Sequence, residues 1–264
     1  MKVFVAADLE GCAGITTWDE IYPTHPEYVK AAEEMTREVC AVCETLVEAG
    51  AEVVVKDSHF QGKNIDYAKL PESVHMVRMH GGTPDAMVQG IDKTYDAAMF
   101  IGFHSGASMP GNPLSHTMNR KLTKMMINGM TASEYLLHAY VAASYRVPVI
   151  FVSGDKMLCD WIHDFNPSVT TAAIKDACGA GVQTLSSAGA CALLRQQVRV
   201  ALQNGSKCRL DLPKTFQVEM QYKEIADATI AAYYPGVQRI DSNTIGFTAH
   251  SIRELMTTRM FIQG

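Results

Sequence analysis

Short apolar runs alternate with longer amphipathic stretches along the first part of the chain. Each run has the length of a buried strand and is bounded by polar or turn residues, whereas each longer stretch repeats its apolar positions with helical spacing. The expected strands are residues 3–7, 52–56, 97–103 and 147–152, and the expected helices are residues 27–49, 84–89 and 131–145. Alternation of this kind predicts an α/β fold with a mostly parallel, open sheet flanked by helices.

The pattern changes after Asn166-Pro167. From there it predicts strands at residues 169–174, 216–222 and 246–249, and helices at residues 187–203, 224–233 and from Ser251 onward. We therefore expect a catalytic α/β domain over residues 1–166 and a smaller α+β lobe over residues 167–264, although a single domain fits the same pattern. A further strand, residues 122–127, is expected to turn at Asn128-Gly129, a dipeptide favoured in tight hairpin turns.

Polar side chains that can bind metals follow three of the expected strands. Asp8 and Glu10 come after the first strand, His59 after the second and His104 after the third. Open parallel sheets bind ligands beyond the carboxyl ends of their strands, so the four side chains should meet at one rim. Asp8 and Glu10 point to the same side of an extended chain, where two carboxylates repel each other unless a cation lies between them. Carboxylates combined with imidazoles suit zinc or a similar first-row metal.

Local structure offers another explanation for several of the candidate residues. Asp8 could cap a turn, and His59 could belong to an ordinary loop. The segment 131–134 fits a capping box in which Glu134 folds back onto the first amide of a helix, so the local pattern alone makes Glu134 a cap. His116 lies in a loop rich in Gly and Pro. It could act there as a general acid or base, donate to an oxyanion, or be a hydrogen-bonded loop histidine.

Composition and missing motifs narrow the possible functions. The chain has 264 residues, a formal net charge of −5 and no block of Lys and Arg that could contact phosphates, so nucleic acid is not an expected partner. No apolar stretch has the length of a signal peptide or a membrane span, which predicts a cytoplasmic protein without a membrane partner. Seven scattered cysteines fit reduced thiols. The motifs of serine hydrolases, P-loop proteins, HExxH metallopeptidases and dinucleotide-binding folds are missing, which leaves a metal site as the main hypothesis.

Six segments, taken in order, carry a resemblance to a known family. They are Asp8-Leu9-Glu10-Gly11, Asp57-Ser58-His59, Gly102-Phe103-His104, Ser115-His116-Thr117-Met118, Ile127-Asn128-Gly129 and Glu134. Together they resemble the D-aminopeptidase family of dinuclear zinc peptidases, peptidase family M55. The resemblance implies two zinc ions per subunit, or another divalent first-row metal, with Asp8 bridging both and His116 as the active-site histidine. It also implies that Glu134 is a metal ligand and not a helix cap. The metal ligands that it implies are Asp8, Glu10, His59, His104 and Glu134.

The resemblance also implies a function. It predicts a metal-dependent aminopeptidase that hydrolyses the N-terminal peptide bond of short peptides, such as D-alanyl-D-alanine, in a homo-oligomer that forms a ring-shaped decamer. His116 would stabilise the oxyanion or protonate the leaving amine, and we rank its direct attack on the carbonyl below attack by water. Loops around the site depart from the family pattern, for example at Phe60 directly after His59, which leaves the preference for D- or L-residues open.

Two other functions remain open on the sequence. A dinuclear metal site also serves phosphoesterases. The site segments lack an Arg that would clamp a phosphate, although Arg120 and Lys121 lie near His116. The second alternative is a non-catalytic metal-binding protein that kept the ligands and lost turnover.

Overall fold

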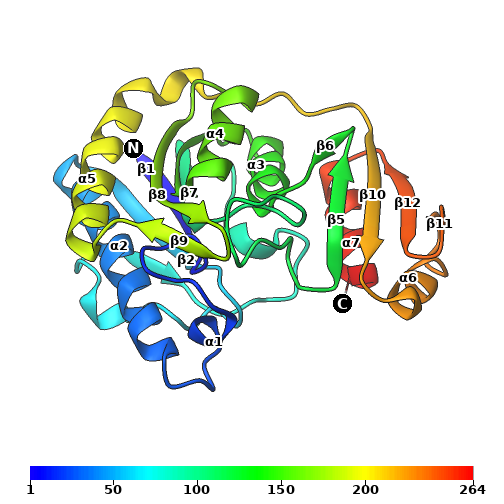
Figure 1. Cartoon of the computed structure of the whole chain (residues 1–264). Helices are drawn as coiled ribbons and strands as arrows, with labels where there is room; N and C mark the ends of the chain where they lie inside the picture. The colour runs from blue at the N-terminus through cyan, green and yellow to red at the C-terminus, as the bar shows by residue number, and fades with distance from the viewer. Residues whose placement is uncertain (264) are drawn as a thin grey trace.

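A seven-stranded sheet forms the larger part of the molecule (Figure 1). The computed structural model describes residues 1–263 and every side chain within them except that of residue 206. Neighbouring strands pair parallel, apart from the antiparallel pair β8–β9 at one edge. In sheet order the strands are β3 (His75–Val77), β2 (Glu52–Asp57), β1 (Lys2–Ala7), β4 (Ala97–Phe103), β7 (Val149–Asp155), β8 (Thr170–Cys178) and β9 (Gly181–Thr184). The predicted α/β fold with a mostly parallel sheet is thus confirmed.

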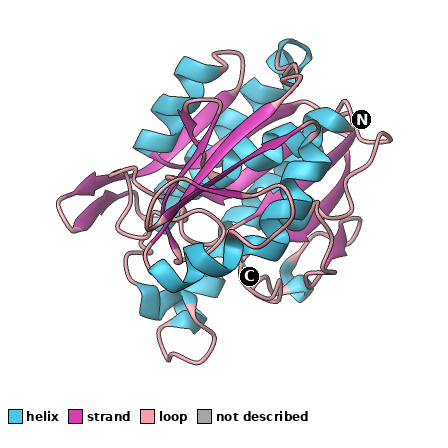
Figure 2. Ribbon diagram, turned by 90° about the vertical axis from the view of Figure 1, so that its right-hand side faces the viewer, coloured by secondary structure: helices cyan, strands magenta, loops and turns pink. Residues whose placement is uncertain are grey.

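Helices cover both faces of this sheet (Figures 1 and 2). On one face α2 packs against α5, and Arg195 of α5 donates to the backbone carbonyl of Ala41 and pairs with Glu44. The opposite face carries α3 and α4. The helices are α1 (Trp18–Ile21), α2 (Tyr28–Glu48), α3 (Glu134–Ser144), α4 (Lys156–Phe165) and α5 (Ser187–Asn204), with short 3-10 turns η1 (Tyr67–Lys69), η2 (Ala86–Val88) and η3 (Gly205–Lys207). Within the described residues, each helix is too short or too polar to cross a membrane.

A second, antiparallel sheet lies beside the first (Figure 1). In β10, buried and exposed residues alternate, so one face of this sheet packs inward while the other meets solvent. Helix α7 packs against β10 and β12 and also contacts α3 of the larger layer. In order the strands are β11 (Gln238–Arg239), β12 (Thr244–Ala249), β10 (Phe216–Tyr222), β5 (Leu122–Ile127) and β6 (Met130–Thr131), accompanied by α6 (Ile225–Ala231) and α7 (Ile252–Gln263).

The two sheets do not divide the chain at residue 166. Strands β8 and β9 come after that position but extend the large parallel sheet, whereas β5 and β6 come before it and belong to the small one. Strand pairing at an edge is not local in sequence, so the order of segments along the chain does not reveal it. The division into residues 1–166 and 167–264 stays a prediction about domains.

Several expected elements differ in their limits. The stretch 84–89 forms only the 3-10 turn η2, and the helix expected over 131–145 begins at Glu134, because Thr131 is still part of β6. Helix α4 follows β7 directly and was not expected, since its N-cap Asp155 is also the last residue of the strand.

The register of the central strands determines where the segments that follow them leave the sheet. Ala7 at the end of β1 lies opposite Asp57 of β2 and Ile101 of β4. Strands β1 and β4 are almost wholly buried, which explains their unbroken apolar sequences. The segments that leave β1, β2 and β4 therefore emerge together at one edge of the sheet.

Candidate metal centre

Close packing of glycine backbone brings the end of β1 against the end of β4. The amide of Gly11 donates to the carbonyl of Gly102 at 2.8 Å, and a Cβ atom on Gly11 would lie 1.9 Å from the carbonyl oxygen of Phe103. Gly102 itself has a φ of +69°, a conformation that favours glycine. This contact turns Asp8 and Glu10 toward the side chain that follows β4.

Two buried donors hold the main chain at Glu10. The Nζ of Lys175 and the Nδ2 of Asn112 both donate to the carbonyl oxygen of Glu10, and Lys175 also donates to the carbonyl of Ile15 at 2.6 Å. Burial lowers the pKa of Lys175. No local sequence signal predicts this support, because Lys175 lies in β8, far along the chain from the residue that it holds.

His59 faces Asp8 and Glu10 from the loop after β2. Its Nδ1 lies 3.3 Å from Oδ1 of Asp8 and 3.0 Å from Oε2 of Glu10. Its Nε2 lies 2.9 Å from the carbonyl oxygen of Ile21, which can only accept a hydrogen bond. Nε2 therefore carries the hydrogen of the neutral ring, and Nδ1 keeps a lone pair for a cation.

His104 repeats this arrangement at the end of β4. Its Nδ1 donates to the carbonyl of Ser105 at 2.8 Å, so the lone pair of the neutral ring is on Nε2. That atom lies 3.6 Å from Oδ2 of Asp8 and 3.6 Å from Oε2 of Glu134. In the neutral form, each of these two rings thus directs a nitrogen lone pair toward the carboxylates.

Glu134 is the first residue of α3, and its side chain does not form the capping box that local sequence suggests. The N-cap is Ser133, whose hydroxyl accepts from the amide of Leu136, while Thr131 lies in β6. The Oε1 of Glu134 instead accepts a 2.6 Å hydrogen bond from the amide of Met118, which leaves Oε2 directed to His104. The interpretation of Glu134 as a cap was therefore wrong.

The five side chains form two donor groups that share one carboxylate. In one group Asp8 joins Glu10 and His59, and in the other Asp8 joins His104 and Glu134, with the candidate donor atoms of each group within 4.8 Å of one another. Three of these atoms are buried without a hydrogen-bond partner: Oδ2 of Asp8, Oε2 of Glu10 and Nε2 of His104. Buried polar atoms without partners are costly, and a cation between them would satisfy all three. The donor set of carboxylate oxygens and imidazole nitrogens fits divalent first-row cations.

Electrostatics at this centre also favour bound positive charge. Burial, together with the neighbouring charge of Glu10, raises the pKa of Asp8 to about 7. For Glu134, burial acts upward, but the charges of His104 and His116 outweigh it and lower the pKa to about 2. Burial opposes the protonation of His104, yet Glu134 raises its pKa to about 10. Three carboxylates this close remain ionised together only with cationic partners among them.

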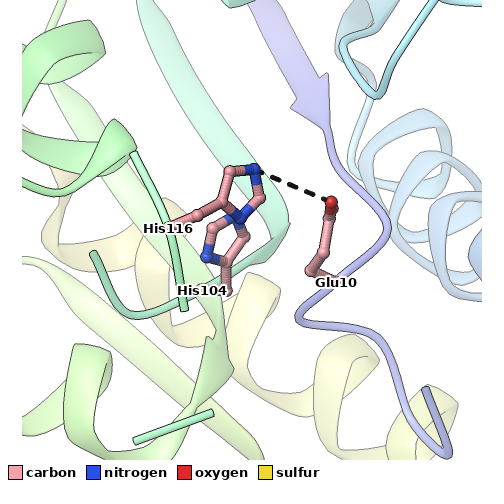
Figure 3. Close-up of side chains that lie close together, drawn as sticks. All are labelled: Glu10, His104 and His116. Carbon is pink, nitrogen blue, oxygen red and sulfur yellow. Dashed lines mark ion pairs between the residues drawn. The ribbon is translucent and has the colours of Figure 1, made fainter. Parts of the chain in front are cut away.

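His116 lies on the solvent side of His104. The two rings stack with centroids 4.5 Å apart and planes at 15°, and Figure 3 shows the His116 ring facing Glu10. Its Nδ1 donates to the carbonyl of Leu114 at 2.9 Å, while Nε2 lies 3.5 Å from Oε1 of Glu134 and 4.0 Å from Oε1 of Glu10. Burial and the charge of His104 lower the pKa of His116, which favours the neutral ring with its lone pair on Nε2.

A cavity of about 330 Å³ opens over these residues. Its remaining wall consists of side chains that sequence analysis did not assign to the site. Phe60 and Met118 have φ angles of 48° and 67°, which non-glycine residues rarely adopt and which are common beside functional sites. These unassigned wall residues include Trp18, Ile21, Tyr22, Phe60, His80, Met118 and Arg120. Sequence position identifies only some of them, because Phe60 follows His59 and Met118 and Arg120 follow His116, whereas Trp18, Ile21 and Tyr22 come from the distant segment of α1.

Comparison with known proteins identifies the family of the chain. The family model described as D-aminopeptidase, peptidase family M55, matches residues 1–261. The D-aminopeptidase of Bacillus subtilis (strain 168) is 31% identical over 258 residues, which cover 96% of this chain and 93% of that protein. A solved structure of the Zn-dependent D-aminopeptidase DppA from Bacillus subtilis, a self-compartmentalizing protease, superposes with a TM-score of 0.93 at 30% identity, over 100% of this chain and 97% of that one. The chain belongs to the D-aminopeptidase family of peptidases, M55, and is a hydrolase.

Proposed function

We propose that this protein is a zinc-dependent aminopeptidase that removes the N-terminal D-residue from short peptides such as D-alanyl-D-alanine. Membership of the D-aminopeptidase family supports the reaction class. The observation that carries the proposal is the position of Asp8, whose two carboxylate oxygens face two separate imidazoles. A single carboxylate between two donor groups is the arrangement that a two-metal hydrolase requires.

The proposed ligand assignment gives two zinc ions to each subunit. Asp8 would be shared by both ions, Glu10 and His59 would complete the ligands of one, and His104 and Glu134 those of the other. The hydrogen bonds of His59 to Ile21 and of His104 to Ser105 support this assignment, because they fix both ring orientations and direct a lone pair inward. When bound, such paired ions polarise a carbonyl and lower the pKa of water.

His116 is the proposed catalytic residue. Its Nδ1 hydrogen is engaged by the carbonyl of Leu114, so the neutral ring can accept a proton at Nε2 but cannot donate one from that atom. We therefore assign it the role of a base that takes a proton from the attacking water and then delivers it to the leaving amine. Stacking on His104 and edge contact with Trp18, whose ring centroid lies 5.5 Å away, hold the imidazole in this orientation.

The two ends of the cavity differ in chemistry, which suggests the direction in which a peptide binds. Asp8, Glu10 and Glu134 lie at one end of the cavity, where bound metal ions would hold the free amine of a peptide. The apolar faces of Trp18 and Phe60 line part of the remaining wall and suit small side chains. With the amine at the metal-binding end, the first peptide carbonyl would lie near His116.

We further propose that the subunits assemble into a homo-oligomer, specifically a ring-shaped decamer. We also propose that this assembly is located in the cytoplasm. The solved relative is described as self-compartmentalizing, which supports oligomerisation. Exposed apolar side chains on the small lobe, including Ile230, Tyr233 and Phe261, supply surface for subunit contacts. Light scattering during size-exclusion chromatography measures the assembly directly.

All seven cysteines are free thiols, which fits the reducing environment of the cytoplasm.

The reaction is tested by measuring the release of free amino acid from matched D- and L-dipeptides. We expect purified enzyme with zinc to cleave D-alanyl-D-alanine faster than L-alanyl-L-alanine, and chelation to abolish both activities until zinc is restored. Hydrolysis of an aryl phosphate in parallel tests the phosphoesterase alternative and is expected to be absent. Failure to cleave either dipeptide with zinc bound would overturn the proposal.

A further inference from the structure

The cavity above the metal centre has one permanently cationic side chain in its wall. Among the fifteen lining residues, all within the described chain, Arg120 is the single Arg or Lys. Its guanidinium carbon lies 4.2 Å from the centroid of the Trp18 ring, and Arg120 is otherwise exposed. Within residues 1–263, no carboxylate forms an ion pair with Arg120. A charged group held over an aromatic face without an anionic partner keeps its donors available to a ligand.

The main chain before Arg120 is fixed on both sides. The hydroxyl of Thr117 donates to the carbonyl of Ala132, and the carbonyl of Thr117 accepts from Nε2 of Gln263 at 2.6 Å. Next to Arg120, the Nδ2 of Asn119 donates to the carbonyl of Gln263 at 3.0 Å. The loop that carries both His116 and Arg120 is therefore attached to Ala132, directly after β6, and to the end of α7, which restrains its backbone.

A short peptide can reach from one of these residues to the other. The ring of Trp18 contacts both, with its centroid 5.5 Å from that of His116 and 4.2 Å from the guanidinium carbon of Arg120. The guanidinium is therefore no farther from the imidazole than these two distances together. An extended chain covers roughly 3.3 to 3.6 Å per residue, so two or three residues are enough to cover this upper limit.

We propose that Arg120, supported by the face of Trp18, binds the C-terminal carboxylate of a short peptide whose free amine lies at the metal-binding end of the cavity. The inference rests on the proposed peptidase function and adds a specificity-determining residue to it. A metal centre that holds the amine at one end and a cation that holds the carboxylate at the other fix the direction of the substrate and limit its length. Dipeptides and tripeptides with a free carboxyl end are thus preferred to amidated or longer peptides.

Arg120 lies at the end of the substrate away from the scissile bond. It contacts the carboxylate equally in the ground state and the transition state, so its loss should raise KM and leave kcat nearly unchanged. Because hydrogen bonds between charged groups at a partly exposed site are of moderate strength, we expect KM to rise about tenfold. A role limited to loop structure would instead affect every substrate alike.

The test compares D-alanyl-D-alanine with its C-terminal amide in four zinc-loaded proteins: wild type, Arg120→Met, Arg120→Lys and Lys124→Met. Lys124 is exposed in β5 outside the cavity lining, so its variant removes one positive charge as a matched control. We expect wild type and Lys124→Met to show the same preference in kcat/KM for the free acid. In Arg120→Met this preference should fall about tenfold, because KM for the free acid rises. Arg120→Lys should restore part of the preference.

Three results would overturn the inference in distinguishable ways. If Arg120→Met lowers kcat/KM equally for the acid and the amide, Arg120 supports the loop and does not read the carboxylate. If it changes neither, the carboxylate binds elsewhere. If wild type cleaves neither peptide while zinc is bound, the proposed function itself fails and this inference fails with it.

Discussion

The ammonium group of Lys175 donates to the main-chain carbonyl of Glu10, although 165 positions separate the two residues in the sequence. Lys175 is only 3% exposed, and its second bond to the carbonyl of Ile15 pulls the whole turn after β1 toward β8. A buried cation thus fixes the backbone from which two candidate metal ligands project, without contacting a metal itself.

Replacing Lys175 with Met should weaken zinc binding by roughly 10–100-fold, as expected when a residue that orients metal ligands is lost. The carbonyls of Glu10 and Ile15 would lose a donor, and the turn would relax. Competition with a chromophoric chelator measures the affinity. Lys156→Met is the matched control, because Lys156 is exposed on α4 and pairs with Asp160 of its own helix. An unchanged zinc affinity in folded Lys175→Met would refute this supporting role.

His116→Ala should separate turnover from metal binding. We expect zinc content to equal that of wild type while kcat falls by about 100-fold or more, because the base that takes and returns the proton is missing. His104→Ala is the comparison variant and should lose zinc, since Nε2 of His104 faces both Asp8 and Glu134. Elemental analysis and initial rates on the same samples are sufficient. Wild-type turnover in His116→Ala would remove the residue from the mechanism.

Gly11→Ala should disrupt the site through backbone packing alone. The added methyl group would lie 1.9 Å from the carbonyl oxygen of Phe103, far inside van der Waals contact. We expect a loss of about 2 kcal/mol or more in unfolding free energy and a loss of bound zinc. Gly181→Ala is the control, because its Cβ would meet only the Cys178 carbonyl at 3.7 Å. Thermal unfolding compares them, and equal melting temperatures would contradict the prediction.

His138 gives the protein a defined sensitivity to acid. It is buried behind Glu134, with Nδ1 donating to the Glu134 carbonyl and Nε2 accepting from the amide of Met87, and burial lowers its pKa to about 4. An unfolded His takes up a proton near pH 6.5, so the unfolded chain binds more protons between these values. Stability is therefore retained above about pH 6.5 and lost as pH falls toward 4, by up to about 3 kcal/mol.

The measurement is the unfolding free energy from pH 7 to pH 4 in wild type and His138→Gln. Glutamine does not titrate, so this variant should lose less stability over the window. His163→Gln, which changes an exposed histidine of α4, should behave as wild type. Parallel pH curves for wild type and His138→Gln would contradict the assignment.

Much of the fold could be predicted because its strands carry local signals. Strands β4 and β10 have the limits that their apolar or alternating patterns predicted, and the turn after β5 has positive φ at both Asn128 and Gly129, as expected for that dipeptide. The assignment of β5 to the second sheet was not predictable in this way. Its partner β10 lies nearly a hundred residues away, and a local pattern does not identify a distant neighbour.

Most of the candidate ligands could also be located from local signals in the sequence. Asp8, Glu10, His59 and His104 follow parallel strands, and the structure brings them together at the expected rim. Glu134 was misassigned by local pattern, because helix position alone does not reveal where a side chain points. Arg120 was noted only as a neighbour of His116, and its place in the cavity wall depends on Trp18 from a distant segment.

The proposed role of Asp8 is to join two metal sites whose joint occupation produces peptidase activity. To test it, zinc is titrated into chelated, desalted enzyme while hydrolysis of D-alanyl-D-alanine and bound zinc are measured together. We expect activity to reach its maximum at two zinc ions per chain, and Asp8→Asn to remain inactive over the same range. Full activity at one zinc ion per chain, or activity in the chelated protein, would contradict it.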